Sequence, residues 1–590
     1  MKTLIDTLLR QALASLPETL VPAAARNLDI EIERTRESQH GDFASNIAMR
    51  LAKAARQNPR KIAEALLAAM PASALSHAAI AKVEIAGAGF INFFLKDDAY
   101  HAELGRVLTQ GADYGRSTVG GGRSVLVEFV SANPTGPLHV GHGRHAAFGA
   151  TVANLLETVG YRVAREYYIN DAGRQMEILA ASTWLRYLER CGERFTFPAN
   201  GYRGDYIVAI ADRLYAVEGA ALRHSATEVF KDLPSDEPEG GDKDIYIDAL
   251  IVRARQLIGD SAFRRVLDHA VDGILSDIRE DLAEFGVTFD SWYSERSLSD
   301  SGAIDKAVGT LEAAGHAYRK DGALWFKSTD YGDEKDRVVV RDNGIKTYFA
   351  SDIAFVLNKL ERGFEHLLYI WGADHHGYIA RLRAGLVALG GSAEVFEVRL
   401  VQFVSLFRGG EKAQMSTRSG EFVTLRDLRK EVGNDAARLF YVMRSNDQHL
   451  DFDLELAKAR SNDNPVYYIQ YAHARVSSVK RQLHERGISH DAAHGLASLA
   501  KLCEPQELQL IKRLAAYPEI VQQCAVQRAP HTLVHYLRDL ANDFHTYYSA
   551  HQFIVEDAAL RDARLTLALA TQVVIRNGLG LLGVSAPDTM

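Results

Sequence analysis

The chain has 590 residues, of which 47% are hydrophobic and 24% are charged, and it carries a net charge of −8. This composition is ordinary for a globular protein and excludes disordered, collagen-like and fibrous proteins. A membrane helix needs about 18 or more apolar residues in a row, and no run in the sequence approaches that length. The three cysteines form no CxxC pair, which argues against a disulfide framework or a cysteine-based zinc site. We therefore expect a soluble, cytoplasmic protein of several domains that contacts no membrane.

The first part of the chain is predicted to be a small α+β domain over residues 1–115. Helical periodicity runs through residues 4–13 and 62–67, and strand-like stretches follow at 83–85 and 90–95.

A second domain is predicted over residues 120–410. Residues 125–130 are a run suited to a buried parallel strand, and an alanine-rich helix is expected from about residue 143 to 159. Strand-like stretches at 338–340 and 367–371 each lie near a helical segment. Together these patterns indicate an α/β core that is interrupted by insertions.

Three further segments complete the predicted organisation. Residues 231–248 are acidic and contain proline and glycine, which predicts an exposed loop. Residues 411–455 are expected to form a connecting region. From 456 to 590 the pattern is helical almost to the end, which predicts an all-α helix bundle.

The strongest motif spans residues 128–142, with the sequence EFVSANPTGPLHVGH. A buried strand ends, a Pro/Gly turn follows, and His-x-Gly-His opens a helix. The N-terminus of a helix binds phosphate, because it offers unpaired N–H groups and a partial positive charge. His139 and His142 lie about one turn apart and can face one ligand, and Gly141 lets a base or ribose approach the backbone. The alternative interpretation is that the two histidines merely cap the helix.

At these residues the sequence resembles the class I aminoacyl-tRNA synthetases, and more narrowly the arginyl-tRNA synthetases. Residues 40–46 (HGDFASN) and 89–93 (GFINF) resemble the N-terminal domain of that family, and residues 578–584 with the terminal Met590 resemble its anticodon-binding bundle. The resemblance spans essentially the whole chain. It implies that the predicted α/β core is Rossmann-like, and it assigns these residues to the signature: Ala132, Asn133, Pro134, Thr135, Gly136, Pro137, Leu138, His139, Val140, Gly141 and His142.

The resemblance also implies a reaction. The enzyme would ligate L-arginine to tRNA(Arg) through arginyl-adenylate, consuming ATP together with Mg²⁺ and releasing AMP and pyrophosphate. The family leads us to expect a monomer. Two alternatives remain open, a nucleotidylyltransferase that shares the His-x-Gly-His chemistry and an RNA-binding relative that has lost activity.

A second signature is expected in the loop at residues 414–420 (QMSTRSG), where the family carries lysines that steady the ATP phosphates. Gln414 and Thr417 stand in place of those lysines, and Gly136 stands where some relatives carry a compensating one. The nearby cations are Lys412 and Arg418, which we assign to ATP together with Ser416. The alternative is an exposed polar loop without a catalytic role.

Arginine recognition is expected at Tyr348 and Asp352, which lie one helical turn apart and can face one pocket. A carboxylate matches the planar fork of a guanidinium. The resemblance assigns Tyr348 and Asp352 to the guanidinium, and it assigns Glu128, Ser131 and Asn133 to arginine as well. Without the resemblance, Asp352 is equally well explained as a helix cap.

Residues 374–376 (DHH) suggest a metal site by composition, but adjacent histidines point apart and no third ligand follows at metal spacing. We therefore predict no zinc, and we assign Asp374 to ATP and His375 to arginine.

Two regions are predicted to bind tRNA. Phe90 and Asn92 alternate with apolar residues on a strand, so that a ring and an amide share one face, which suits an unstacked base. The helical C-terminal part contains aromatic residues interleaved with cations, among them Tyr468 and Arg475, and ends at Met590. For Phe90 and the tyrosines, ordinary core packing is the alternative.

Overall fold

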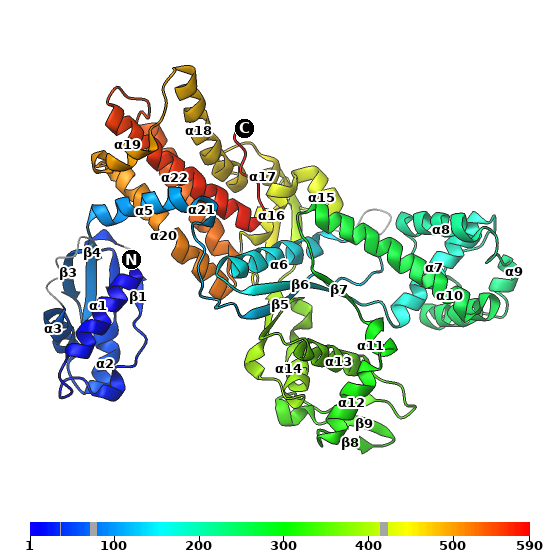
Figure 1. Cartoon of the computed structure of the whole chain (residues 1–590). Helices are drawn as coiled ribbons and strands as arrows, with labels where there is room; N and C mark the ends of the chain where they lie inside the picture. Colours follow the sequence, from blue (N-terminus) through cyan, green and yellow to red (C-terminus); the bar gives the residue numbers. More distant parts are fainter. Residues whose placement is uncertain (36, 71–79, 414–422) are drawn as a thin grey trace.

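The computed structural model describes residues 1–35, 37–70, 80–413 and 423–590. Figure 1 shows an N-terminal unit, a central sheet with two insertions, and a helical C-terminal part that lies above the sheet. Gln414, Ser416, Thr417 and Arg418 lie outside the described residues.

The N-terminal unit is an antiparallel sheet with helices packed on it. Its strand order is β1-β2-β4-β3, with β1 Ile32–Arg34, β2 Phe43–Ser45, β3 Ile80–Ala86 and β4 Phe90–Leu95. The helices are α1 Lys2–Ser15, α2 Ile47–Ala55 and α3 Pro59–Ala69, and α5 Asp97–Gln110 leads into the central sheet.

The central sheet has five parallel strands in the order β12-β11-β5-β6-β7. Val125, Leu126 and Val127 of β5 are fully or almost fully buried, as expected for a central strand that is covered on both faces. The strands are β5 Ser124–Glu128, β6 Arg162–Ile169, β7 Ser291–Ser294, β11 His366–Gly372 and β12 Phe396–Val401. Helix α6, Val140–Thr158, crosses the sheet beneath the C-terminal helices.

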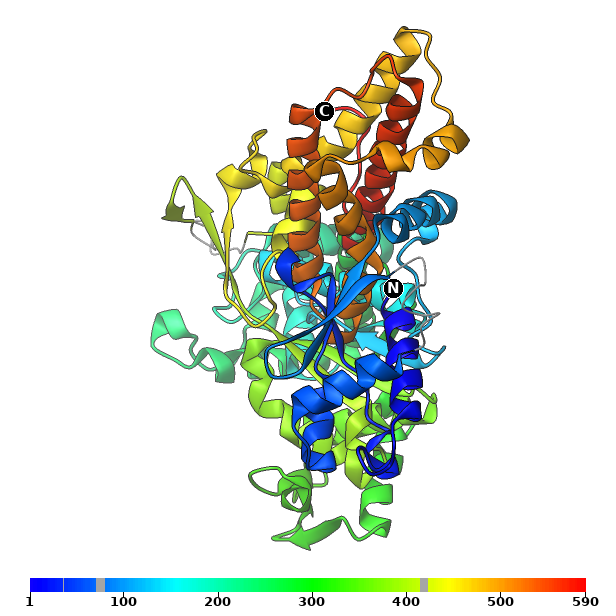
Figure 2. The same cartoon turned by 90° about the vertical axis from the view of Figure 1, so that its left-hand side faces the viewer.

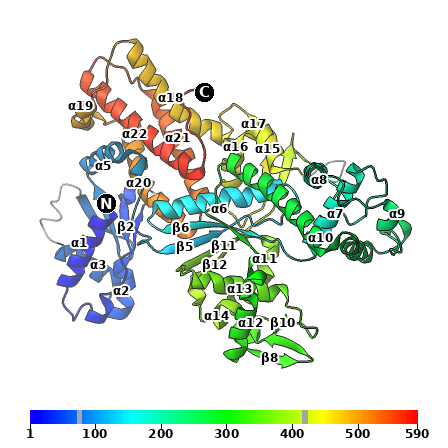
Figure 3. The same cartoon turned by 45° about the vertical axis from the view of Figure 1, so that its right-hand side comes forward.

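Two insertions interrupt this sheet, and Figure 3 shows them extending to the right of it and below it. The first lies between β6 and β7 and contains α7 Arg174–Arg190, α8 Asp205–Glu218, α9 Ala226–Val229 and α10 Lys243–Glu284. The second lies between β7 and β11 and contains α11 Arg296–Asp300, α12 Ala303–Ala313, β8 Ala317–Lys320, β9 Ala323–Phe326, β10 Arg337–Val340 and α13 Tyr348–Glu361. After β11 come a 3-10 turn, η6 Ala373–Tyr378, and α14 Ile379–Ala388.

Three local predictions differ from the structure. The strand at 338–340 is β10, which pairs antiparallel with β9 in a separate sheet and not with the parallel core. The helix expected from residue 143 begins earlier, at Val140, because His139 caps it. The segment 231–248 is only partly a loop: α10 begins at Lys243, where the side chain of Asp242 accepts hydrogen bonds from the next turn.

The connecting region joins the sheet to the helical part. It contains β13 Val404–Arg408, β14 Glu411–Lys412, α15 Leu425–Val432, α16 Asn434–Val442, β15 Leu450–Asp453 and α17 Leu454–Lys458. The C-terminal helices are α18 Pro465–Glu485, α19 Ala492–Ala497, α20 Pro505–Gln527, α21 Pro530–Ala550 and α22 Ala558–Leu582. By length and apolar composition α22 is able to cross a membrane, but 67% of its most apolar window is buried inside the protein, as in a core helix.

The N-terminal unit, which faces the viewer in Figure 2, lies against α20. Arg34 donates to Glu519 at 3.1 Å, and Lys512 pairs with Asp42 at 2.9 Å. The predicted fold class, an α/β core with insertions between an α+β unit and a helix bundle, is confirmed.

Candidate active site

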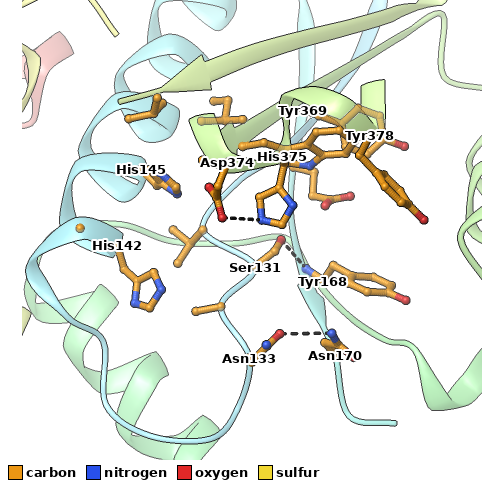
Figure 4. Close-up of a pocket in the computed structure, with 18 of the residues that line it drawn as sticks. Ser131, Asn133, His142, His145, Tyr168, Asn170, Tyr369, Asp374, His375 and Tyr378 are labelled. Carbon is orange, nitrogen blue, oxygen red and sulfur yellow. Dashed lines mark hydrogen bonds and ion pairs between the residues drawn. The ribbon is translucent and has the colours of Figure 1, made fainter. Parts of the chain in front are cut away.

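A pocket lies at the carboxyl ends of the parallel strands, where ligands bind in open α/β sheets. It encloses about 740 Å³. Figure 4 shows side chains from α6, the turn after β5, the end of β6 and the segment after β11 pointing into it. The predicted residues that the fold brings together here are Glu128, Ser131, Asn133, His139, Gly141, His142, Tyr348, Asp352, Asp374 and His375.

His139 and His142 both cap α6 and border the pocket. Nδ1 of His139 accepts from the backbone N–H groups of Gly141 at 3.1 Å and of His142 at 3.4 Å. Nδ1 of His142 accepts from the backbone N–H of His139 at 3.3 Å, and the two rings stack with centroids 3.6 Å apart. The capping interpretation is therefore correct as geometry, and it coexists with a position in the pocket wall.

The two histidines are neutral hydrogen-bond donors. Since each Nδ1 accepts a hydrogen bond, the proton of each neutral ring lies on Nε2. Burial lowers the pKa of His139, and burial with the neighbouring His139 and His145 lowers the pKa of His142 well below its ordinary value. At neutral pH they offer N–H groups to a ligand rather than positive charge.

The first signature is joined by backbone hydrogen bonds to the segment that follows the second. Leu425 N–H donates to the carbonyl of Leu138 at 2.7 Å, and Val140 N–H donates to that of Val423 at 3.2 Å. Thr424 forms a β-bridge with His139. Lys412, by contrast, is exposed on β14 and does not line the described part of the pocket.

The turn after β5 is strained where it enters the pocket. Val130 and Ser131 have φ of +66° and +40°, which is unusual for residues with a side chain and above all for a β-branched one. Ser131 Oγ accepts from the N–H of Tyr168 at 3.1 Å, and Asn133 is held by Asn170 at 3.2 Å and Gln175 at 3.1 Å. The strained backbone thus presents two fixed polar side chains.

Acidic side chains form the opposite part of the pocket. Asp352 of α13 accepts a hydrogen bond from Tyr378, and Glu295 follows directly after β7. Burial raises the pKa of Asp352 to about 6, with Glu128 adding to the rise. Burial, together with Asp352 and Asp171, raises the pKa of Glu295 to about 7. Oε2 of Glu295 is buried and has no hydrogen-bond partner among the described residues.

These acidic groups need a cation or protons. A carboxylate without a partner is costly to bury, so the buried Oε2 of Glu295 favours a positively charged or hydrogen-bond-donating group in this part of the pocket. Tyr348 lies at the mouth with 60% of its surface exposed. A Cβ on Gly173 would come within 2.6 Å of its hydroxyl, so the position of Tyr348 depends on that glycine.

Asp374 and His375 lie in η6 and line the pocket, and Figure 4 shows them side by side. His375 Nε2 is 3.6 Å from Asp374 Oδ2, and both side chains are about 60% exposed. Within the residues that the structure describes, no three His, Cys, Asp or Glu side chains are grouped as metal ligands.

The residues predicted to contact tRNA lie outside the pocket. Phe90 is 42% exposed, but Asn92 on the same strand is only 4% exposed. In the helical part, the guanidinium of Arg475 stacks on the rings of Tyr471 and Tyr548 at 4.5 and 4.7 Å. Tyr468 donates to Asn542, and Met590 is 52% exposed.

Sequence reasoning missed the other polar residues of the pocket, above all Glu295, Tyr378 and His145. Glu295 stands at the end of a strand-like run, Ser291–Ser294, which is the one signal that pointed to it. His145 lies three residues after His142 on α6, and burial lowers its pKa to about 4.

A His-x-Gly-His helix start at the carboxyl ends of a parallel sheet fits the catalytic domain of a class I aminoacyl-tRNA synthetase. In agreement, the profile of the class I (R) tRNA synthetase catalytic domain matches residues 103–462. The arginyl-tRNA synthetase N-terminal domain matches residues 3–95, and the DALR anticodon-binding domain matches residues 469–590.

Individual relatives agree over the full length. The chain is 57% identical to an arginine–tRNA ligase of Thioalkalivibrio sulfidiphilus over 590 residues, covering 100% of both chains. It is 58% identical to one of Hydrogenovibrio crunogenus, covering 95% of each. The solved Thermus thermophilus arginyl-tRNA synthetase has the same fold, with a TM-score of 0.73 at 23% identity and 100% coverage of both chains. The chain belongs to the arginyl-tRNA synthetase family.

The raised pKa values of Asp352 and Glu295 predict that arginine binding depends on pH. Both groups are charged above their pKa values and protonated below them, so a cationic ligand loses its partners as the pH falls through 7 and then 6. Lowering the pH from about 8 to about 5.5 should raise KM for arginine tenfold or more, since each unit below a pKa costs about tenfold.

The measurement is KM for arginine and for ATP across this pH range, with circular dichroism at each pH as the control for folding. KM for ATP should change much less. A KM for arginine that stays constant in folded enzyme would show that these carboxyl groups do not bind the substrate.

Proposed function

We propose that this chain joins L-arginine to tRNA(Arg) in two steps that share the pocket described above. The carboxylate of arginine attacks the α-phosphorus of ATP, which forms arginyl-adenylate and expels pyrophosphate. A hydroxyl of the terminal ribose of the tRNA then attacks the activated carbonyl, which forms arginyl-tRNA and releases AMP. The observation that carries this proposal is that one cavity joins the neutral histidines of the first signature to two acidic side chains, Asp352 and Glu295, that form no ion pair among the described residues.

The acidic part of the pocket would bind the guanidinium of arginine. Glu295 is buried and Asp352 is half-buried, and a bidentate cation would satisfy both carboxylates. Tyr348 covers the mouth and Tyr378 orients Asp352. A neutral amino acid of similar size would leave both carboxylates unpaired, which is a strong basis for rejection. We assign Glu128, Ser131, Asn133 and His375 to the rest of the substrate, nearer to the signature.

The histidine side of the pocket would bind ATP. Nε2–H groups of His139 and His142 would donate to the phosphates as charge develops on them, and Gly141 leaves room for the nucleotide. We assign Asp374, Lys412, Ser416 and Arg418 to ATP as well. Mg²⁺ would enter with ATP and neutralise phosphate charge, and we assign no protein residue to it.

Two distant surfaces would bind the tRNA. We propose that residues 1–115 contact its elbow through Phe90 and Asn92. We propose that residues 456–590 contact its anticodon through Tyr468, Arg475 and Met590. The exposed Phe90 supports its role because bases stack on such rings. The half-buried Arg475, stacked on Tyr471, supports the second role by placing a cation among aromatic rings. We further propose that the enzyme is a monomer and acts in the cytoplasm.

Arginine-dependent ATP–pyrophosphate exchange, run with and without tRNA(Arg), tests the proposed function. Membership of the arginyl-tRNA synthetase family argues against the nucleotidylyltransferase alternative. The exchange assay distinguishes an active ligase from an inactive RNA-binding relative. We expect exchange with arginine that requires bound tRNA, and charging of tRNA(Arg) by the same preparation. Binding of tRNA without charging, under both conditions, would overturn the proposal.

His142→Ala should slow adenylate formation while leaving arginine affinity nearly unchanged. Its Nε2–H lies on the ATP side of the pocket, and loss of one fixed donor at such a site costs on the order of 10²–10³ in rate. The measurement is the single-turnover rate of activation, with the exposed His484→Ala on α18 as the matched control. An unchanged rate would remove His142 from the mechanism.

Phe90→Ala should weaken tRNA charging while sparing the affinities for arginine and ATP. Stacking of a base on an aromatic ring contributes about 1–3 kcal/mol, so kcat/KM for tRNA should fall by roughly tenfold. Asn92→Ala, alone or combined with Phe90→Ala, should also lower kcat/KM for tRNA. Because Asn92 is buried, the folding of these variants must be checked.

The control for Phe90 is Val217→Ala, which shortens an exposed apolar side chain on α8. Equal charging of tRNA by folded Phe90→Ala and by the wild type would show that Phe90 does not read a base.

A further inference from the structure

A row of polar side chains crosses the central sheet beside the pocket. Glu128 of β5 stands in register between Glu166 of β6 and Tyr369 of β11. All three are buried, and Glu166 is completely inaccessible. Like charges placed directly opposite each other on neighbouring strands repel, so two ionised carboxylates in this row need a counter-charge.

Lys359 of α13 supplies that counter-charge from above the row. Its side chain is fully buried, and its ammonium donates to Oε2 of Glu128. The ammonium also lies 3.7 Å from Oε1 of Glu166 and 4.1 Å from the centroid of the Tyr369 ring. A buried lysine is uncommon unless it is paired, and this one is held from several sides.

Each of the two buried carboxylates, Glu128 and Glu166, has its own cation. Arg362 binds Oε2 of Glu166 at 2.6 Å, so Glu166 has its own strong partner. Lys359 makes its hydrogen bond to Glu128 instead. Two carboxylates and two cations therefore balance, and Lys359 is the cation that belongs to Glu128.

Each member of this pair depends on the other for its charge. Burial alone would lower the pKa of Lys359, but Glu128, Tyr369 and Glu166 together raise it above its ordinary value. Burial raises the pKa of Glu128, and Lys359 is the strongest influence that opposes this rise. Loss of Lys359 would therefore raise the pKa of Glu128 further and favour its neutral form.

Lys359 acts on the pocket from behind its wall. Glu128 lines the cavity, whereas Lys359 is not among the described residues that line it. Lys359 reaches the pocket through the lining residues that it contacts, Glu128, Phe355 and Tyr369, and Glu128 is the charged one among these three. Lys359 also lies on the helix that begins with Tyr348 and contains Asp352, so the same pair ties that helix to β5.

We propose that Lys359 is a positioning residue for arginine recognition, which holds Glu128 as an oriented carboxylate in the pocket wall. The proposal rests on the proposed function, in which Glu128 contacts arginine. Lys359 itself touches no substrate. Its contribution is to keep a fixed negative charge where burial would otherwise remove it.

A double-mutant cycle between Lys359 and Glu128 tests the proposal. The variants are Lys359→Met, Glu128→Gln and the double variant, with Lys306→Met as the matched control. Lys306 forms an exposed ion pair with Glu361 of the same helix α13. The measurements are KM for arginine, KM for ATP, kcat for aminoacylation and the midpoint of thermal unfolding.

We expect Lys359→Met to raise KM for arginine by about tenfold or more, which corresponds to about 1.4 kcal/mol. KM for ATP should stay within about twofold of the wild type, and Lys306→Met should change neither KM. In the Glu128→Gln background, Lys359→Met should raise KM for arginine no further, because coupled residues are not additive. A purely structural role would lower the unfolding midpoint without this selective, non-additive effect.

An unchanged KM for arginine in folded Lys359→Met would overturn the proposal, and so would fully additive effects in the double variant. If Lys359→Met does not fold, the comparison of Glu128→Gln with the double variant remains decisive. The double variant removes both charges of the pair, which is often tolerated, and in Glu128→Gln the ammonium of Lys359 keeps Glu166 at 3.7 Å as a counter-charge. Equal KM values then support the proposal, and a higher KM in the double variant overturns it. Failure of the wild type to charge tRNA with arginine would instead refute the proposed function.

Discussion

Two backbone hydrogen bonds, from Leu425 to Leu138 and from Val140 to Val423, hold the site together. They join the turn before α6 to the start of α15, although most of the central domain separates these segments in the sequence. Tyr441 adds a third bond, from its hydroxyl to the carbonyl of Val140. Because His139 and His142 stand at the same turn, their position depends on this joint.

The joint is braced from the first insertion. Arg426 and Arg429 of α15 both bind Asp281 of α10, at 2.7 and 3.2 Å, and Asp281 is almost completely buried. Arg144 continues the bracing inside α6, where it donates to the carbonyls of Gln402, Ser445 and Gln448. An insertion that appears peripheral in Figure 1 therefore supports the first turn of the signature helix.

The acidic side chains in and behind the pocket wall fall into two groups, one paired with cations and one without an ion pair. Glu128 lies in the pocket wall and is paired with Lys359. Glu166 lies behind the wall and is paired with Arg362. Within the described parts of the chain, neither Asp352 nor Glu295 forms an ion pair. The negative charge that is left over faces the cavity, and it is this remainder that a guanidinium is proposed to neutralise. Selectivity thus depends on how completely the other acids are balanced.

The sequence predicted the features that are local in the chain. The strand at 125–130, the turn and the helix-opening histidines are contiguous, and Tyr348 and Asp352 share one helix. Features that depend on long-range pairing escaped. Residues 338–340 have a strand pattern that does not reveal which sheet they join, and Glu295 reaches the pocket only because β7 pairs with β6 after a long insertion. Lys359 gave no signal, because a lysine in a helix is usually exposed.

The self-capped start of α6 has a consequence for what can bind there. The N–H groups of Gly141 and His142 already have an acceptor, the imidazole nitrogen of His139. A ligand that accepts from these N–H groups must displace that nitrogen. It gains only the difference in free energy between its own hydrogen bonds and those that it displaces. A neutral oxygen gains little by such an exchange, whereas an anionic one forms bonds about twice as strong. The capped helix end therefore favours the binding of charged phosphates over that of uncharged nucleosides.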